Sequence, residues 1–293
     1  MTVILSFGGY DMLLGGVTAA AVLASLVICT AAGGFAALQW LWILPVSFLG
    51  CWIVLAGLCF LTILLILQRV DTTVPREEDS PFYRRLGILV ADAVTTLLQM
   101  RIHTQGMEQL PQEGRYLLVC NHLDILDPVV LLHSFPKSQL AFISKKENKS
   151  MFMVGKLMHA LMCQLIDREN DREALKTILK CIKILKEDKA SIAVFPEGYI
   201  SLESKLHHFR PGVFKIAQKA GVPIVVCTLT NTTKIFHNAA RLRKTDIQLH
   251  LVGVVPGEAL KGVTTVEISN RVYDMMARDL GPELVLQEEE SNT

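Results

Sequence analysis

The chain has 293 residues, which is enough for one sizeable hydrophobic core and a small additional segment. Hydrophobic residues make up 51% of the chain and charged residues only 19%, a balance too apolar for an ordinary soluble domain. The seven cysteines contain no CxxC pair, so the sequence indicates no disulfide scaffold, zinc site or redox site.

The excess of apolar residues is concentrated at the N-terminus, where no charged residue occurs between Asp11 and Arg69. Residues 12–35 and 40–67 are each long enough to cross a bilayer, which takes roughly 20 apolar residues. A glycine-rich break at residues 31–34 separates them. A cleaved signal peptide would need a basic N-terminal region, which is missing. We therefore predict a transmembrane helical hairpin over residues 1–70, the alternative being a buried pair of core helices.

The distribution of basic residues predicts the orientation of this hairpin. Arg69, Arg76, Arg84 and Arg85 follow the second apolar run, whereas no lysine or arginine precedes it. Because basic residues accumulate on the cytoplasmic side, we expect an integral membrane protein with two N-terminal spans and its following domain on the cytoplasmic face. Membrane lipids are the expected surroundings, and no nucleic-acid partner is expected.

Residues 71–105 are predicted to form a linker and an amphipathic helix. Ser80 and Pro81 resemble a helix start, with proline in the first turn. Apolar residues then recur at helical spacing at positions 82, 86, 89, 93 and 97. This helix could lie on the membrane surface or pack against the rest of the protein, and the pattern leaves both possibilities open.

Residues 106–283 are predicted to form the main domain, followed by a disordered acidic tail at 284–293. Strand-like runs begin just before it and cover residues 100–104, 116–120, 140–144, 163–166, 191–195, 222–228 and 247–254. Helical stretches lie between several of them, including 170–187 and a last helix that Thr264 and Glu267 would cap. We predict an α/β fold with a largely parallel central sheet and flanking helices.

The segment from Cys120 to Pro128 is the most informative for chemistry. His122 lies in a loop between a strand and a helix start, and this loop can fold Asp127 back toward the imidazole. A carboxylate that accepts the proton of one ring nitrogen leaves the other nitrogen free to act as a base toward a hydroxyl nucleophile. Asp124 is a competing partner for His122. The alternative is that Asp127 only caps the helix and that His122 lies beside it without a chemical role.

Two further segments also follow strands. Pro196, Glu197 and Gly198 form a tight turn that would present a carboxylate, and the glycine permits a ligand to approach the backbone closely. Arg168 could bind a phosphate through its planar guanidinium, although an ion pair with Asp167 or Glu169 would explain it equally well. His207 and His208 lack companion ligands, so no metal site is expected.

Together these segments resemble the glycerolipid acyltransferase family, typified by 1-acylglycerol-3-phosphate acyltransferases, over roughly residues 81–254. The family's first motif corresponds to Asn121, His122 and Asp127, and its second to Lys145, Glu147, Gly155, Ile166 and Arg168. Its third motif corresponds to Phe195, Pro196, Glu197 and Gly198, and its fourth to residues 222–225. Asn148, Phe152, Met162 and Val226 depart from the family pattern.

The resemblance implies transfer of a fatty acyl group from a thioester to the hydroxyl of a lysophospholipid, most simply 1-acylglycerol 3-phosphate, to make phosphatidate. His122 and Asp127 would be catalytic. Lys145, Arg168 and residues 195–198 would bind substrate. The donor would be acyl-CoA or acyl carrier protein, with no cofactor. Alternatives are acylation of glycerol 3-phosphate or another lysolipid, and a non-catalytic lipid-binding protein; a lipid hydrolase would need a nucleophile that is not visible.

One departure concerns the acceptor. The family often continues the third motif with threonine and arginine, but Tyr199 and Ile200 stand here instead. A basic residue associated with the acceptor phosphate is therefore missing at this position. Lys145, Arg168, Lys205 or Arg210 could compensate for it.

Overall fold

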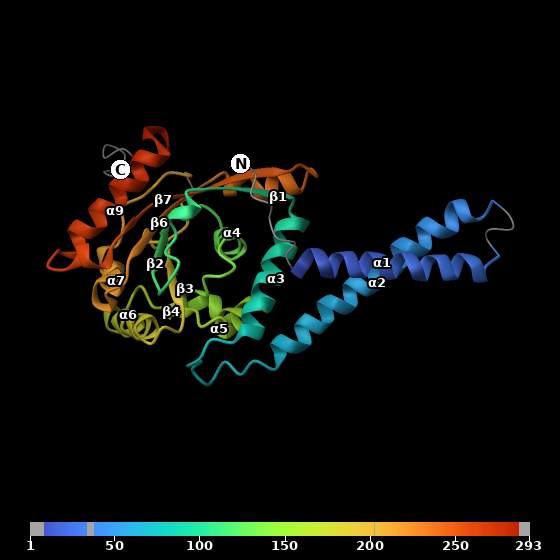
Figure 1. The fold of residues 1–293 in the computed structure, drawn as a ribbon, viewed down its shortest axis with the longest axis horizontal. Helices are drawn as coiled ribbons and strands as arrows, with labels where there is room; N and C mark the ends of the chain where they lie inside the picture. The colour runs from blue at the N-terminus through green and yellow to red at the C-terminus, as the bar shows by residue number, and fades with distance from the viewer. Residues whose placement is uncertain (1–8, 34–37, 202, 287–293) are drawn as a thin grey trace. The chain divides into compact units, whose positions relative to one another are not determined.

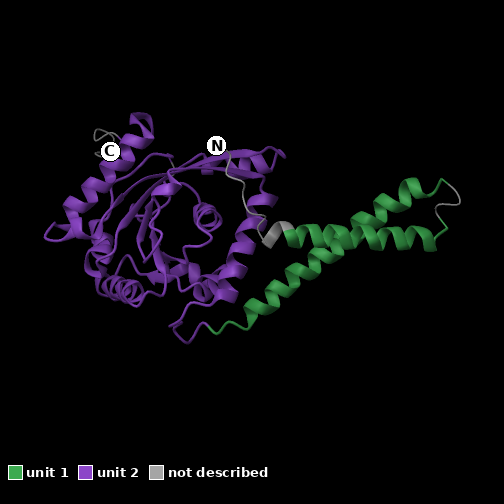
Figure 2. Ribbon diagram, viewed as in Figure 1, with its two compact units in different colours: residues 1–71 green, residues 72–293 purple. Residues whose placement is uncertain are grey.

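The computed structural model describes residues 9–33, 38–201 and 203–286. The chain divides into two compact units, Met1–Asp71 and Thr72–Thr293, which are coloured separately in Figure 2. Residues 34 and 35 of the first predicted span and residues 287–293 of the predicted tail lie outside the described residues.

Unit 1 contains the helices α1 (Gly9–Ala31) and α2 (Trp40–Gln68). They pack against one another, and the indole nitrogen of Trp52 donates a hydrogen bond to Thr18 Oγ1 at 3.4 Å. Met12–Ala31 and Trp40–Gln68 are long and apolar enough to cross a membrane, and the structure buries only 17% and 0% of their most apolar windows. A pair of soluble core helices would be mostly buried, so the two helices are candidate membrane spans.

Unit 2 begins with a linker and the helix α3 (Pro81–Leu97), which packs against the rest of the unit. Its buried residues are Arg84, Leu86, Gly87, Ala91 and Thr95. The Arg84 guanidinium donates to Asp79 Oδ1 at 2.7 Å and to the carbonyl oxygens of Leu140 and Leu161. Of the two alternatives for this helix, packing against the domain is therefore the one that the structure shows.

Within the described residues of unit 2, seven strands form one sheet in the order β1-β7-β6-β2-β5-β3-β4. The strands are β1 (Met100–Gln105), β2 (Leu117–Cys120), β3 (Leu140–Lys145), β4 (Gln164–Ile166), β5 (Ser191–Val194), β6 (Ile224–Thr230) and β7 (Thr245–Val255). All neighbours pair in parallel except β6 and β7. The predicted α/β fold with a largely parallel sheet is confirmed, and each predicted strand is present to within two residues at either end.

Helices cover both faces of the sheet (Figure 1). One face packs against α6 (Asp171–Lys186), α7 (Lys215–Ala220) and α9 (Thr265–Leu280); the other packs against α4 (Asp127–Ser134). The short helices α5 (Val154–Ala160) and α8 (Ile235–Ala239) complete the unit. The central strands β2 and β5 are buried along their whole length, as expected for parallel strands covered on both sides.

Local sequence signals explain where the two long surface helices begin. The Asn170 side chain accepts a hydrogen bond from the Glu173 backbone at the start of α6. Thr264 and Glu267 form the predicted capping box at the start of α9, which satisfies backbone N–H groups that the helix itself cannot. Gly281, with φ of 81°, follows the last residue of α9, where a left-handed φ favours glycine.

Candidate active site

The site is built where β2 and β5 end, at the centre of the sheet. The buried Asn121 follows β2, and its side chain accepts from the Leu229 backbone N–H at 2.7 Å and donates to the Leu229 carbonyl oxygen at 2.9 Å. This pair of bonds ties the end of β2 to β6. The next residue, His122, is thereby held at the mouth of the loop that leads into α4.

His122 and Asp127 are brought together by this loop. His122 Nδ1 lies 2.9 Å from Asp127 Oδ2, and the Asp127 side chain is fully buried. The same oxygen accepts from the backbone N–H groups of Leu123 and Asp124, at 2.6 and 2.8 Å. The carboxylate therefore folds back onto the loop instead of capping α4. Asp124, the competing candidate, instead accepts from the Leu126 backbone.

The imidazole of His122 is also held from the side. Its ring stacks on Phe195 with centroids 4.1 Å apart, and Phe195 in turn stacks at 6.5 Å on Phe142 of β3. His122 keeps 16% of its side chain exposed. Among the described residues no side chain or backbone group bonds to Nε2, so this nitrogen is available to a ligand. A neutral imidazole with Nδ1–H donating to a carboxylate presents Nε2 as a base.

The turn after β5 binds the backbone of His122 through two hydrogen bonds. Glu197 Oε2 accepts from the His122 N–H at 3.2 Å, and the Ser201 N–H donates to the His122 carbonyl oxygen at 2.8 Å. Glu197 is 1% exposed, and its other oxygen lies 3.5 Å from the His207 N–H. Burial raises the pKa of Glu197 to about 8, although these backbone N–H groups act in the opposite direction. Glu197 therefore organises the loop and does not reach solvent.

The Arg210 guanidinium lies against this turn, and its charge acts on Arg168. Arg210 donates its backbone N–H to the Pro196 carbonyl oxygen at 2.9 Å, and its Nε lies 2.8 Å from where a Cβ at Gly198 would be. Gly198 also has φ of 85°, so a side chain there would be strained and would displace Arg210. Burial lowers the pKa of the half-buried Arg168, and the nearby Arg210 lowers it further.

The ion-pair explanation for Arg168 is not realised among the described residues. Asp167 pairs with Lys146 at 2.7 Å, and no described carboxylate lies within ion-pair distance of Arg168. Lys145, at the end of β3, is exposed and lies 3.7 Å from Glu147. Arg210 is near enough to Arg168 to lower its pKa, whereas Lys145 lies exposed beside Glu147. Tyr199 packs edge-on against His207.

Phe142 and Ser201 belong to the site but were not singled out from the sequence. Phe142 was visible only as an apolar strand residue, and its contact with Phe195 depends on the register between β3 and β5. Ser201 acts through its backbone N–H, which carries no sequence signal. Within the described residues, no group of three or more histidine, cysteine or acidic side chains could hold a metal ion.

Part of the chain is similar to known proteins. Residues 101–230 match the family model described as Acyltransferase. A probable 1-acyl-sn-glycerol-3-phosphate acyltransferase of Mycoplasma pneumoniae is 32% identical over 48% of this chain and 53% of its own length. A 1-acyl-sn-glycerol-3-phosphate acyltransferase of Chlamydomonas reinhardtii is 31% identical over 61% of this chain and 53% of its own length. The chain thus spans about half the length of these two relatives.

A solved structure has the same fold. The crystal structure of the 1-acyl-sn-glycerophosphate acyltransferase PlsC from Thermotoga maritima superposes with a TM-score of 0.56, at 22% identity, over 67% of this chain and 78% of that one. Its similarity extends beyond the segment matched by the family model. Residues 101–230, which match the Acyltransferase family model, include His122, Asp127 and the turn at Glu197.

Proposed function

We propose that this protein is an O-acyltransferase that moves a fatty acyl group from a thioester to the hydroxyl of a lysophospholipid, most simply 1-acylglycerol 3-phosphate, to form phosphatidate. The observation that carries the proposal is the His122–Asp127 pair, 2.9 Å apart, with Nε2 of His122 open to a ligand. The names of the relatives supply the substrate class.

In the proposed reaction, Nε2 of His122 removes the proton of the acceptor hydroxyl while the oxygen attacks the thioester carbonyl. The tetrahedral intermediate then expels the thiolate, which takes up a proton, and the new ester remains. Asp127 accepts the Nδ1 proton, keeps the ring in the productive tautomer and stabilises the imidazolium form. General-base assistance of this kind contributes about 10²–10⁴ in rate. Acyl-CoA or acyl carrier protein is the proposed donor.

Arg168 and Arg210 are the proposed site for the acceptor phosphate. A phosphate dianion between two guanidinium groups relieves the repulsion between them, and each can donate two hydrogen bonds to it. Arg210 reaches Gly198 from the chain segment after the third motif. In this proposal Arg210 replaces the arginine that the family often has directly after the third motif, where this chain has Tyr199 and Ile200.

We further propose that α1 and α2 span a membrane and that unit 2 works on its cytoplasmic face. The length and apolar surface of the two helices support the spans. The basic residues that follow α2 support the orientation. A lysophospholipid acceptor is a membrane lipid, so an enzyme anchored in the membrane has direct access to it.

The test is acyl transfer by purified full-length protein, with 1-acylglycerol 3-phosphate and labelled acyl-CoA or acyl carrier protein. We expect His122→Gln to lower the turnover number by about 10²–10⁴. Asp127→Asn should also lower it strongly because the imidazole loses its orienting carboxylate.

Asp124→Asn is the matched control, since Asp124 does not contact the His122 ring, and it should retain most of the activity. Folded His122→Gln protein with activity within a few-fold of the unaltered protein would exclude this mechanism. A screen of glycerol 3-phosphate and other lysolipids in the same assay identifies the acceptor.

A further inference from the structure

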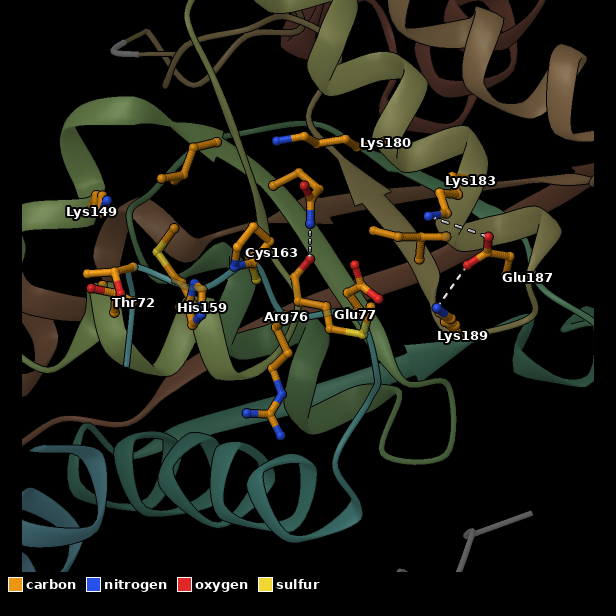
Figure 3. Close-up of a pocket in the computed structure, with 18 residues that line it drawn as sticks. Thr72, Arg76, Glu77, Lys149, His159, Cys163, Lys180, Lys183, Glu187 and Lys189 are labelled. Carbon is orange, nitrogen blue, oxygen red and sulfur yellow. Dashed lines mark hydrogen bonds and ion pairs between the residues drawn. The ribbon is translucent and has the colours of Figure 1, made fainter. Parts of the chain in front are cut away.

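A cavity of about 350 Å³ opens at the outer edge of the sheet, away from the His122 site. Its walls are the linker at residues 72–77, the helix α5, the edge strand β4 and the C-terminal half of α6 (Figure 3). This volume lies within the usual range of small-ligand sites. None of the residues proposed to be catalytic lines it.

The cavity is separated from His122 by three strand spacings of the sheet. It borders β4, which is the third strand from β2 in the sheet order. Strands lie about 4.8 Å apart, so the lateral offset between β2 and β4 is ~14 Å. The cavity is therefore a second site and does not extend the first.

Positive charge dominates the walls. The charged lining residues are Arg76, Lys149, Lys180, Lys183 and Lys189, against Glu77 and Glu187. Lys183 and Lys189 lie 3.8 and 2.8 Å from Glu187, as the dashed lines in Figure 3 show. Lys149 and Lys180 stand on different walls, and no described carboxylate lies within ion-pair distance of either. Two uncompensated ammonium groups thus border one concave space.

The position of Lys149 is fixed by close packing of the backbone. Gly155, at the start of α5, lies so close to the 3₁₀ turn Lys146–Ser150 that a Cβ there would be 2.1 Å from the Lys149 carbonyl oxygen. Only glycine permits this approach. Gly155 is a motif residue that the proposed acyl transfer does not use, and its packing holds Lys149 at the rim of the cavity.

We propose that this cavity binds the phosphate of an anionic membrane lipid head group. Lysine ammonium groups suit a phosphate as point charges, and the apolar side chains of Met158, Met162 and Leu165 line the same space. The cavity wall begins at Thr72, four residues after Gln68, the last residue of α2. Four residues reach at most ~14 Å. Given the proposed span, the cavity therefore opens close to the head groups of the bilayer.

The test measures lipid binding and does not depend on acyl transfer. Full-length protein in neutral detergent is titrated with phosphatidylglycerol or phosphatidylcholine, and bound lipid is counted by native mass spectrometry. The variant Lys149→Gln/Lys180→Gln should bind phosphatidylglycerol about 10-fold or more weakly, because each basic residue near an anionic head group contributes a several-fold gain in affinity. Phosphatidylcholine binding should not change, and Lys180→Arg should retain phosphatidylglycerol binding.

Lys186→Gln is the matched control, since Lys186 is exposed on the same helix but does not line the cavity. Equal phosphatidylglycerol affinity in the double variant and in Lys186→Gln would overturn the proposal. Binding of inorganic phosphate with the same affinity as phosphatidylglycerol would also overturn it, because the lipid would then contribute nothing beyond its phosphate. An inactive protein that still shows the lysine-dependent difference would separate this site from the proposed enzyme function.

Discussion

The loop between β2 and α4 shows how six residues of sequence set the geometry of the site. Asn121 locks its start to β6, and Asp127 accepts three hydrogen bonds from within the loop itself. The spacing of His122 and Asp127 allowed their contact to be predicted. The choice between Asp127 and Asp124 could not be made from spacing, because it depends on which carboxylate the loop backbone turns inward.

Glu197 could be recognised as a motif residue, but its role could not be derived from the sequence. It bonds to the backbone of a residue 75 positions away, and such a contact exists only once β2 and β5 are paired. The same holds for Arg210, whose proximity to Arg168 depends on the path of the chain after β5. Contacts between residues that follow different strands of the sheet cannot be predicted from sequence patterns.

The buried Glu197 gives the stability of the protein a defined pH dependence. Its pKa is raised by burial from 4.5 to about 8, so the folded protein binds more protons than the unfolded chain between these values. Stability from this group is fully present below pH 4.5 and is lost as the pH rises through about 8, with a slope of at most ~1.4 kcal/mol per pH unit.

The measurement is the melting temperature of the full chain between pH 4.5 and 8.5, compared with that of Glu197→Gln. We expect the melting temperature of the unaltered protein, relative to that of Glu197→Gln, to fall steadily as the pH rises. If the melting temperatures of the two proteins differ by the same amount at every pH in this range, the assignment of a raised pKa to Glu197 is contradicted.

The two arginines give a kinetic prediction for the acceptor site. Arg168→Ala and Arg210→Ala should each raise the Michaelis constant for a phosphate-bearing acceptor by roughly 10- to 150-fold, because a charge-assisted hydrogen bond contributes ~1.5–3 kcal/mol. The constant for the acyl donor should change little. Arg168→Lys should restore the affinity for the acceptor only in part, because lysine keeps the positive charge but lacks the planar guanidinium that donates two parallel hydrogen bonds.

Arg172→Ala serves as the control, since this arginine is exposed at the start of α6. An unchanged acceptor constant in folded Arg210→Ala protein would show that Arg210 does not replace the missing motif arginine. It would then point to an acceptor without a phosphate monoester.

Elements were predicted more reliably than contacts. The seven strands were found because each is a short apolar run bounded by polar or turn residues. The short helices α5, α7 and α8 were not predicted, since five to seven residues are too few to show a helical period. The prediction of a largely parallel sheet did not say which strands pair antiparallel; the structure shows that β6 and β7 do, because strand direction depends on the connecting segments and not on the strand sequence.

The helix α3 is held by a buried charge, which leads to a stability prediction. Arg84→Met removes the partner of Asp79 and leaves that carboxylate buried and unpaired. Breaking a buried ion pair on one side costs about 3–5 kcal/mol, which corresponds to a fall in melting temperature of ~6–20 °C for a domain of this size.

The neighbouring Arg85 is exposed, so Arg85→Met is the matched control and should melt within a few degrees of the unaltered protein. Equal melting temperatures for the two variants would mean that the Arg84 contacts do not stabilise α3.

At the scale of the whole molecule, the composition already separated an apolar N-terminal segment from a charged remainder. The structure divides the chain at Asp71, two residues after the first charged residue of that remainder. The boundary was visible because a chargeless run of this length has few explanations other than a membrane. How the remaining residues assemble into one sheet required the structure, since the pairing of distant strands has no local signature.

Removing residues 1–68 should abolish stable membrane attachment. Unit 2 buries Leu86 and Ala91 of α3, and the large apolar side chains that this helix leaves exposed, Phe82 and Leu97, are too few to hold the protein on a membrane. The shortened protein should appear in the supernatant after ultracentrifugation, whereas the full chain should stay with the membranes. Recovery of the shortened protein in the pellet as folded material would locate the membrane attachment in unit 2.

Topology is tested separately with Val74→Cys, an exposed position just after α2. A membrane-impermeant maleimide should label it only from the cytoplasmic side, with the unaltered protein as the background control. Labelling from the opposite side alone would reverse the proposed orientation.

The bond between Asn121 and Leu229 joins residues 108 positions apart, and it affects how the protein is made. Both sheet partners of β2 come later in the chain than β2 itself. At roughly 5–20 residues per second, a ribosome needs on the order of ten seconds to reach Thr230 after synthesising Cys120. Until β5 has emerged, the nascent chain carries an apolar strand with two unpaired edges, and one edge of β2 stays unpaired until β6 follows; unpaired strand edges are prone to intermolecular association. The centre of the sheet, and the His122 loop that it supports, can therefore form only after β6 has emerged.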